Sequence, residues 1–465
     1  MRFSVALLVF VFIFHSGGST AFAISIEDER KMGQQFAISV QRMFPVVDDD
    51  FAVNYFSDLG HYLLRSLDSK PFPFNFYIIN DPTLNAFAGP GGQVFFFTGI
   101  IDVMDSVDEL AAVLSHEIAH VTARHISKRM EQSKKINLAT MAGILAGILI
   151  GGAAAAPIMT GSMAAAQQAQ LSYSREDERQ ADQLGFKYSS AGGFDPLEMI
   201  QTLKKIRRAQ IIGTDSIPPY LLTHPGGPER MSNFETMSMS RNRPLGPENE
   251  QTAKYREFFP LFKTILRAKY SDPLQAESAF KLELEKDPQS TYANFGLGIV
   301  WRESAEYNKA IGHFEEALKR QPDSILILRN LAETYQFKGE DRKAIEVLSK
   351  ALDVDGRDKG SLYLLAMSYQ NLERYSKAIE IYEKLKRRDP VKNEVFYNLG
   401  VSYGRFHQLA NAHYNFGIYF ARLFQFDKAK FHFQKAEGLS QNDPALQNKI
   451  KKIMENGPFL NKKEQ

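Results

Sequence analysis

Residues 108–122 read DELAAVLSHEIAHVT and decide how the first half of the chain folds. The apolar residues recur at three- and four-residue steps, which predicts an α-helix. Residues four apart on a helix are separated by about 40° around its axis, so His116 and His120 can present ring nitrogens to one metal ion. Glu117 lies next to this pair, where its carboxylate can take a proton from a water bound to zinc. The pattern therefore predicts a zinc-dependent hydrolytic site.

Three runs with strand character precede this helix, at residues 74–79, 85–88 and 93–98. The Gly-Pro-Gly-Gly cluster at 89–92 predicts a tight turn between the last two runs. Residues 24–70 have the pattern of amphipathic helices. We therefore expect a mostly helical domain with a small antiparallel sheet. Chance matches to the five-residue motif occur on surface helices, but this one lies on an apolar helix after paired strands, which favours a zinc protease.

A catalytic zinc ion needs a third protein ligand and one open coordination position. The longer motif with a third histidine six residues on is absent, because Ala123 and Ile126 occupy its places. His125 follows His120 by five residues, which on a continuous helix turns it about 140° away. We therefore expect His125 to lie at the surface or outside the ligand sphere.

The third ligand is expected from the acidic segment at residues 174–182, which reads SREDERQAD. Glu178 and Asp182 are four residues apart and share one face of the predicted helix. One carboxylate can bind the metal while the other hydrogen bonds to a ligand imidazole and fixes its tautomer. An acidic cluster alone is more often a solvated helix face. Because the two-histidine site lacks a ligand, we favour the metal-binding interpretation.

Alanine recurs every 34 residues in the C-terminal half, and the flanking residues repeat with it. A 34-residue period with small residues at a helix crossing is typical of tetratricopeptide (TPR) repeats. Such arrays expose a concave groove, so protein binding is favoured over an inert helical scaffold. A half-motif at residues 427–429 predicts an irregular last repeat that caps the array. The repeating alanines are Ala276, Ala310, Ala344, Ala378 and Ala412, and the turn residues are Pro288, Pro322, Gly356 and Pro390.

The chain has 465 residues, which is enough for two or three domains. A formal net charge of +2 gives no sign of a nucleic-acid partner. Without cysteine, the chain holds no disulfide, thiolate zinc site or cysteine nucleophile. Arg2, the apolar run at 5–14 and Ala-Phe-Ala at 21–23 predict a signal peptide cleaved before Ile24. We expect a signal peptide at 1–23, a metalloprotease domain at 24–246 and a TPR array at 247–465.

Residues 141–156 carry no charge and are rich in alanine and glycine. The run ends at Pro157 and is shorter than the ~20 residues that a membrane-spanning helix needs. We therefore expect Met141–Ala156 to form a helical hairpin that is buried or makes peripheral contact with a membrane. If this run and residues 5–14 both lay in lipid, the chain would be an integral-membrane zinc protease, which stays open as an alternative.

The motif set resembles the gluzincin peptidases related to the CAAX prenyl proteases. The matching segments are HEIAH at 116–120, Glu-x-x-x-Asp at 178–182, Asn-Ala-Phe-Ala at 85–88 and Phe-Thr-Gly at 97–99. This resemblance covers nearly the whole chain after the signal peptide once the TPR array is included. It implies an α+β zincin-type metalloprotease domain followed by an all-α TPR solenoid.

The same resemblance implies a role for each residue of the site. His116, His120 and Glu178 are expected to bind one zinc ion per chain. Glu117 is expected to act as catalytic base and acid, and Asp182 to support a ligand from outside the metal sphere.

His224 opens the segment HPGGPER at residues 224–230, which resembles a His-Pro-x-x-x-x-Arg segment of this family. The resemblance implies that His224 can close the open position of the zinc ion and leave the enzyme latent. Two other roles stay open for it: a plain turn residue before Pro225, or a group that polarises the substrate carbonyl. The Gly226-Gly227 pair suits a movable loop.

The order of signal peptide, peptidase domain and TPR array is similar to that of exported proteases of Gram-negative bacteria. It implies a periplasmic endopeptidase that cleaves polypeptides in the quality control or assembly of outer-membrane proteins. The TPR groove is then expected to recruit clients or the outer-membrane protein assembly machinery. We also expect the strand at 93–98 to bind the substrate backbone as an added strand. A TPR chaperone or adaptor with a vestigial protease domain is the alternative, against which the intact site argues.

Overall fold

The computed structural model describes residues 24–132, 173–212, 218–239, 249–388 and 390–456. The chain divides into two compact units, with the boundary in the sequence between Phe262 and Lys263. Each unit is described by itself. The predicted signal peptide and the uncharged run at 141–156 lie outside the described residues. Among the helices that are described, none is both long and apolar enough to cross a bilayer.

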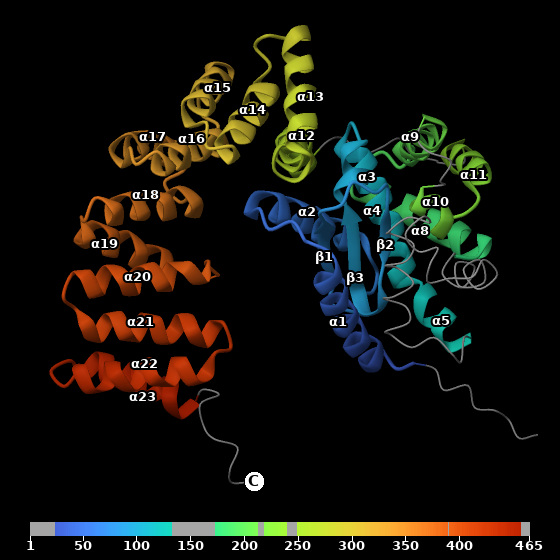
Figure 1. Cartoon of the computed structure of the whole chain (residues 1–465). Coiled ribbons are helices and arrows are strands. Elements are labelled where there is room, and N and C mark those ends of the chain that lie inside the picture. Colours follow the sequence, from blue (N-terminus) through green and yellow to red (C-terminus); the bar gives the residue numbers. More distant parts are fainter. Residues whose placement is uncertain (1–23, 133–172, 213–217, 240–248, 389, 457–465) are drawn as a thin grey trace, which may run out of the picture. The chain divides into compact units, whose positions relative to one another are not determined.

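The first unit contains a three-stranded sheet made of β1 (Asn75–Ile79), β2 (Ala86–Ala88) and β3 (Gln93–Phe97) (Figure 1). The strand order is β1-β3-β2, with β1 parallel to β3 and β2 antiparallel to it. The hairpin expected between the second and third runs is confirmed. The sheet as a whole is mixed rather than antiparallel, because the chain forms β2 at the far edge and then returns as β3 next to β1.

The strand expected to bind substrate is the central strand of this sheet, so that expectation is wrong. Every residue of β3 has a partner on β1, and every one also has a partner or a hydrogen bond on the β2 side. A strand adds a peptide only at an edge where backbone N–H and C=O groups are unpaired. The run of apolar residues marked β3 as buried, but it could not show which strands flank it.

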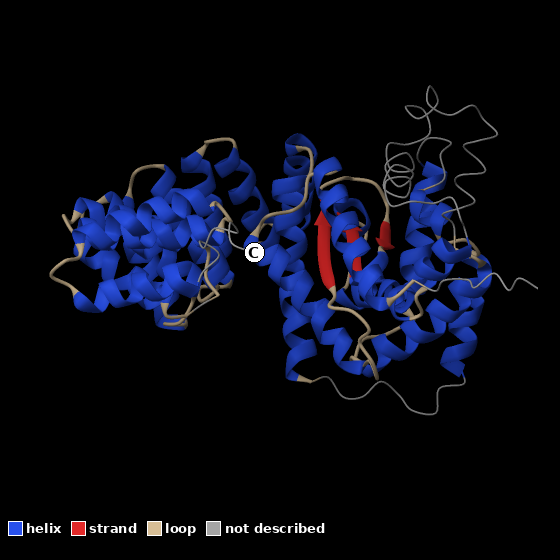
Figure 2. Ribbon diagram, turned by 90° about the horizontal axis from the view of Figure 1, so that it is seen from below, coloured by secondary structure: helices blue, strands red, loops and turns tan. Residues whose placement is uncertain are grey.

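Aromatic side chains cover both faces of β3. On one face Phe95 meets Phe36 of α1 (Ile26–Met43) edge-on, with ring centroids 6.0 Å apart. On the other face Phe96 meets Phe56 of α2 (Asp50–Leu63) at 5.1 Å. Successive side chains of a strand point to opposite faces, so a strand covered on both sides must be apolar at every position. Figure 2 shows the sheet enclosed by helices.

The remaining helices of this unit surround the sheet and build the site. Two of them matter most: α4 carries HEIAH and is buried on every side, and α8 carries Glu178 and Asp182. The full set is η1 (Leu64–Ser66), η2 (Pro90–Gly92), α3 (Thr98–Asp102), α4 (Val107–Thr122), α5 (His125–Gln132), α8 (Arg175–Ala191), α9 (Glu198–Ile212), α10 (Pro219–Thr223), α11 (Gly227–Met239) and α12 (Glu250–Tyr270).

Local signals fix where α4 and α8 begin. The Ser106 side chain accepts a hydrogen bond from the Glu109 amide at the start of α4. Ser174 and Asp177 form a reciprocal capping box at the start of α8. The two helices then approach closely at Gly185, where a Cβ atom would lie 3.1 Å from the Cα atom of His116. A glycine at this position therefore lets α8 bring its carboxylates against the histidines of α4.

The second unit is an all-α array with the expected repeat. A three-residue turn joins the two helices of a repeat, and its middle residue takes a positive φ; these residues are Ala305, Gly339, Glu373, His407 and Phe424. The helices are α13 (Pro273–Lys286), α14 (Thr291–Glu303), α15 (Tyr307–Arg320), α16 (Ile325–Phe337), α17 (Asp341–Val354), α18 (Lys359–Asn371), α19 (Tyr375–Lys386), α20 (Asn393–Arg405), α21 (Leu409–Arg422), α22 (Phe426–Leu439) and α23 (Pro444–Asn456).

The array is irregular near its end, where a half-motif stands in the sequence. The turn at Phe424 joins α21 to α22 and repeats the turn at His407 that joins α20 to α21. Gly417 of α21 packs on Phe433 of α22 as Gly298 packs on Phe314 in the first regular repeat. Helix α21 therefore closes one repeat and opens the next.

The division between the two units falls inside α12. Its first part packs on α2, where Tyr55 stacks on Phe262 at 4.6 Å and donates a hydrogen bond to the Tyr255 carbonyl. The boundary predicted between residues 246 and 247 falls among residues that the structure does not describe, and it stays a prediction.

Replacing Gly185 with valine is expected to destabilise the first unit by about 1–3 kcal/mol, because the new side chain meets the backbone of α4. Gly312 is the matched control, since it is exposed on α15 and a Cβ atom there has nothing within 4 Å. Urea denaturation of Gly185→Val and Gly312→Val measures the difference. Equal stability of the two variants would contradict the close packing of α8 on α4.

Candidate metal centre

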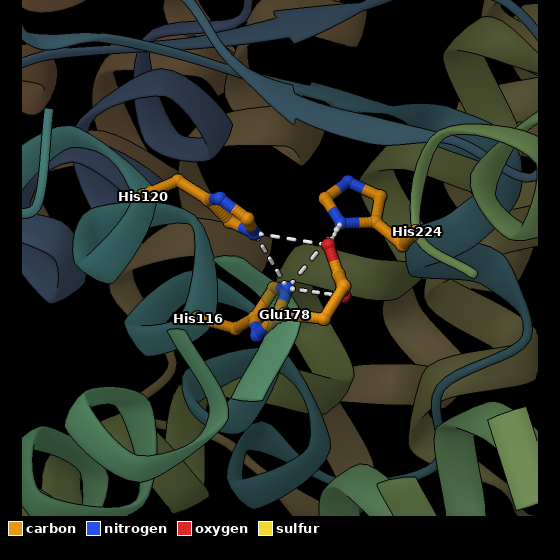
Figure 3. A group of neighbouring side chains, drawn as sticks. All are labelled: His116, His120, Glu178 and His224. Atoms are coloured by element: carbon orange, nitrogen blue, oxygen red, sulfur yellow. Dashed lines mark hydrogen bonds and ion pairs between the residues drawn. The ribbon is translucent and has the colours of Figure 1, made fainter. Parts of the chain in front are cut away.

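Four side chains, from two helices and from the residue after a third, converge in the interior of the first unit (Figure 3). His116 and His120 come from α4, Glu178 from α8, and His224 from the residue after α10. Each is at most 1% exposed, and one ligand atom from each lies within 4.8 Å of the others. The structure thus brings together all four residues that the sequence suggested as metal ligands.

Four of the separations among these atoms are close to those of ligands around a tetrahedral metal ion. The Nε2 atom of His116 lies 3.0 Å from Nε2 of His120 and 3.3 Å from Nδ1 of His224. Oε1 of Glu178 lies 3.0 Å from Nδ1 of His224 and 3.4 Å from Nε2 of His120. A zinc ion ~2.0–2.1 Å from each of four ligands keeps them about 3.3–3.4 Å apart. The donor set of three imidazoles and one carboxylate is also one that zinc prefers.

The catalytic candidate Glu117 lies beside this cluster with both carboxylate oxygens buried. Among the described residues neither oxygen has a hydrogen-bond partner. Its Oε1 lies 3.6 Å from Nε2 of His224. Burial raises the pKa of Glu117, and the opposing effects of His224 and His116 are smaller. A carboxylate with a raised pKa and no hydrogen bond to hold it is suited to exchange protons with a reacting group.

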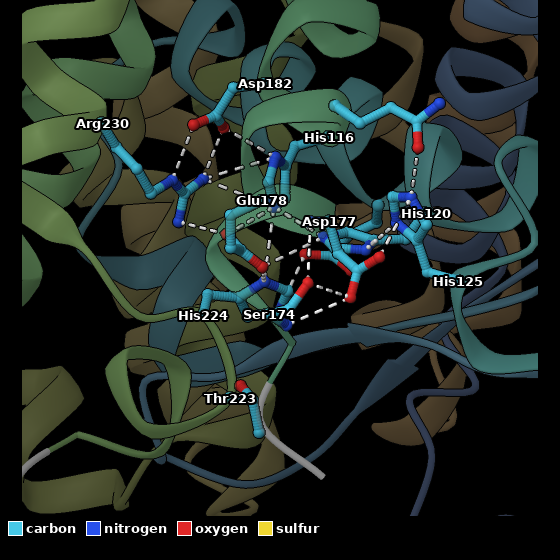
Figure 4. Close-up of polar contacts among 12 residues, drawn as sticks. His116, His120, His125, Ser174, Asp177, Glu178, Asp182, Thr223, His224 and Arg230 are labelled. Atoms are coloured by element: carbon cyan, nitrogen blue, oxygen red, sulfur yellow. Dashed lines mark hydrogen bonds and ion pairs between the residues drawn. The ribbon is translucent and has the colours of Figure 1, made fainter. Parts of the chain in front are cut away.

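Asp182 and Arg230 support the ligands from outside the cluster (Figure 4). Asp182 Oδ1 lies 3.0 Å from Nδ1 of His116. The Arg230 guanidinium is 2% exposed and donates to both Asp182 oxygens at 2.9 and 2.8 Å, while its Nη1 lies 2.9 Å from Glu178 Oε2. Burial would raise the pKa of Glu178 and of Asp182, but Arg230 and the imidazoles hold both below their usual values.

The histidines differ in their affinity for a proton. Burial lowers the pKa of His120 well below its usual value, so its ring is neutral and has a lone pair for a metal. Burial and Arg230 would also lower the pKa of His116, but hydrogen bonds to Asp182 and Glu178 raise it to about 9. To hold a metal ion through Nε2, His116 would have to give up that proton, since metal ligands must be deprotonated.

His224 follows the short helix α10 and is held by its neighbours. Its ring stacks on Tyr220 at 4.5 Å, and the carbonyl before it, of Thr223, accepts a hydrogen bond from the Tyr173 amide at 2.8 Å. Gly226 has a φ of 91°, a conformation that favours glycine, and leads into α11.

Three residues of the centre gave little signal in the sequence. Arg230 appeared only as the last residue of a motif, and nothing local tied it to Asp182. Tyr173 stacks on His120 with ring centroids 3.7 Å apart, and no pattern marked it. His125 is buried against His120 instead of turned away, because α4 ends at Thr122 and a new helix starts at His125. The angle expected for His125 assumed one continuous helix.

Comparison with known families gives a separate match for each of the two units. Residues 54–238 match the model of peptidase family M48, and this range contains all six candidate site residues. Residues 303–385 match the model of anaphase-promoting complex, cyclosome, subunit 3, which is TPR-like. The match lies within the helical array of the second unit.

Three curated proteins that are similar to this chain are named as proteases or endopeptidases. A beta-barrel assembly-enhancing protease from Yersinia pestis is 30% identical over 67% of this chain and 64% of its own length. The Escherichia coli K12 protein of the same name is 29% identical over 66% of this chain and 62% of its own length. The mitochondrial metalloendopeptidase OMA1 of Schizosaccharomyces pombe is 28% identical over 46% of this chain and 61% of its length.

The aligned part of this chain thus spans less than two thirds of the length of these relatives. The match includes the HEIAH helix, and the structure places a metal-binding set of side chains around that helix. Over residues 54–238, in its first unit, this chain is similar to peptidase family M48.

Proposed function

We propose that this chain is a zinc-dependent endopeptidase. The observation that carries the proposal is the buried cluster of His116, His120, Glu178 and His224 with Glu117 beside it, whose carboxylate has no hydrogen-bond partner among the described residues. Family M48 and the relatives named as proteases support it. A scaffold protein has no use for five buried polar side chains that converge on one point, because each costs free energy to desolvate.

The residues divide the work of peptide hydrolysis among them. The chemistry that a bound zinc ion supplies is Lewis acidity, which polarises a carbonyl and lowers the pKa of a water to about 7. His116, His120 and Glu178 would hold the ion. Glu117 takes the proton of the attacking water and returns it to the leaving amine, for which its raised pKa is favourable.

The groups behind the ligands keep them in the correct state. Asp182 accepts from Nδ1 of His116 and leaves Nε2 as the metal-binding nitrogen. Arg230 keeps Glu178 and Asp182 ionised in the interior. Both effects preorganise the site before a substrate arrives.

We also propose a location and a set of partners. The predicted signal peptide would export the chain to the periplasm of a Gram-negative cell. There it would cleave exported polypeptides in the quality control or assembly of outer-membrane proteins, as the names of its relatives suggest. The TPR array would recruit clients or the assembly machinery, because stacked repeats present an extended binding surface.

Replacing Glu117 with glutamine is expected to leave zinc binding intact and to lower the rate of casein cleavage by 10²-fold or more, since an amide does not accept the proton of water. Zinc content is measured by metal analysis and turnover by peptide release. Glu176→Gln is the matched control, because that side chain is 80% exposed on α8. Near-normal cleavage by Glu117→Gln, or stoichiometric zinc in a His116→Ala/His120→Ala double variant, would refute the proposed site.

We propose in addition that His224 is a reversible fourth ligand that keeps the resting enzyme latent. Its Nδ1 atom lies within 3.3 Å of both His116 Nε2 and Glu178 Oε1, a position that excludes an attacking water. Release of this ring requires movement of the segment between α10 and α11. Gly226, with its positive φ, is the residue of this segment whose backbone can change conformation most easily.

Under this proposal His224→Ala raises the basal cleavage of an unstructured substrate at equal zinc content. The measurement is initial rate per bound zinc, with His61→Ala as the control because His61 is an exposed histidine on α2. A clear fall in rate with zinc retained would assign His224 to the substrate carbonyl instead. An unchanged rate would exclude both roles.

A further inference from the structure

The outer nitrogen of His120 faces a second, buried histidine. Nδ1 of His120 lies 2.9 Å from Nδ1 of His125, which is 1% exposed. On the other side of that ring, Nε2 of His125 lies 2.9 Å from Oε1 of Gln180. Three side chains thus form one hydrogen-bonded row that starts at a metal-ligand candidate and ends on α8.

Only one arrangement of protons lets this row coexist with a metal ion. If Nε2 of His120 binds the metal, the neutral ring carries its proton on Nδ1 and donates it. Nδ1 of His125 must then accept, so the proton of His125 is on Nε2. That N–H donates to the Gln180 oxygen, which can only accept.

The backbone is shaped to hold His125 in this place. Arg124 adopts a φ of 55°, a left-handed conformation that is uncommon outside glycine, and it separates α4 from α5. Its guanidinium donates to the buried Glu29 carboxylate at 2.8 Å and to the Ile24 carbonyl at 2.7 Å. These bonds stabilise the turn that swings His125 back toward His120.

The far end of the row is tied to the third ligand. Gln180 lies two residues after Glu178 on α8, a helix fixed against α4 at Gly185. Through His125 of α5, the row therefore links the two helices that supply His116, His120 and Glu178. A shift of α8 would disturb the metal ligand and its support together.

We propose that His125 and Gln180 are positioning residues that fix the tautomer and orientation of His120 and so slow the release of the metal. The proposal rests on the proposed function, because it needs a metal ion on Nε2 of His120. Partners of this kind typically contribute a 10–100-fold effect on metal affinity.

The test compares two replacements of His125 that differ in one property. Asparagine places an acceptor oxygen near the position of Nδ1, whereas leucine fills space without an acceptor. Zinc release to a chromogenic chelator is expected to be 10–100-fold faster in His125→Leu than in the wild type, and His125→Asn is expected to recover most of the loss. A purely packing role predicts the opposite order, since the apolar side chain fills a buried site better.

Gln180 gives a second, independent comparison. Gln180→Leu removes the acceptor and is expected to speed zinc release, while Gln180→Glu keeps an acceptor and is expected to restore slow release. Gln183→Leu is the matched control, because Gln183 is exposed on the same helix. Equal release rates for Gln180→Leu and Gln183→Leu would overturn the role of Gln180.

The tautomer itself is measured by ¹⁵N NMR of histidine-labelled, zinc-loaded protein. The expected result is a neutral His125 ring with its proton on Nε2. A proton on Nδ1 of His125 would overturn the proposal, even if the variants lose zinc. Wild-type protein that binds no zinc would refute the proposed function, whereas zinc-loaded wild type with unchanged variants would refute only the row.

Discussion

The ion pair between Arg230 and two buried carboxylates is the interaction on which the metal centre depends. Glu178 and Asp182 lie one helical turn apart in the interior, and each would cost several kcal/mol to bury as an isolated anion. The planar fork of one guanidinium contacts both of them at 2.8–2.9 Å. Without that charge, protonation of either carboxylate would remove a metal ligand or the acceptor that orients His116.

The sequence could predict those features of the metal centre that depend on residue spacing within a single helix. HEIAH places His116 and His120 on one face at a fixed angle, and Glu178 and Asp182 follow the same rule on α8. The 34-residue period likewise specified the array, because identical spacing requires identical packing. In these cases the geometry is contained in a few consecutive residues.

The missed features depend on contacts between distant residues or on a break in a helix. The central place of β3 follows from where β1 lies, which its own composition does not encode. Arg230 reaches Asp182 only because α11 and α8 pack together in the fold. His125 lies outside the ligand set, as expected, but not at the expected angle, because one left-handed residue, Arg124, ends the helix whose periodicity the prediction extended.

The shared turn in the repeat array bears on how such arrays change in length. The same three-residue turn links α20 to α21 and α21 to α22. Helix α21 is therefore the second helix of one pair and the first helix of the next. Insertion or loss of a single helix, half of the usual period, is then compatible with continuous packing. An inserted or lost helix would exchange the inner and outer positions of every helix that follows it. Whether the number of helices is odd or even would then determine, together with the sequence, which side chains the distal end offers to a partner.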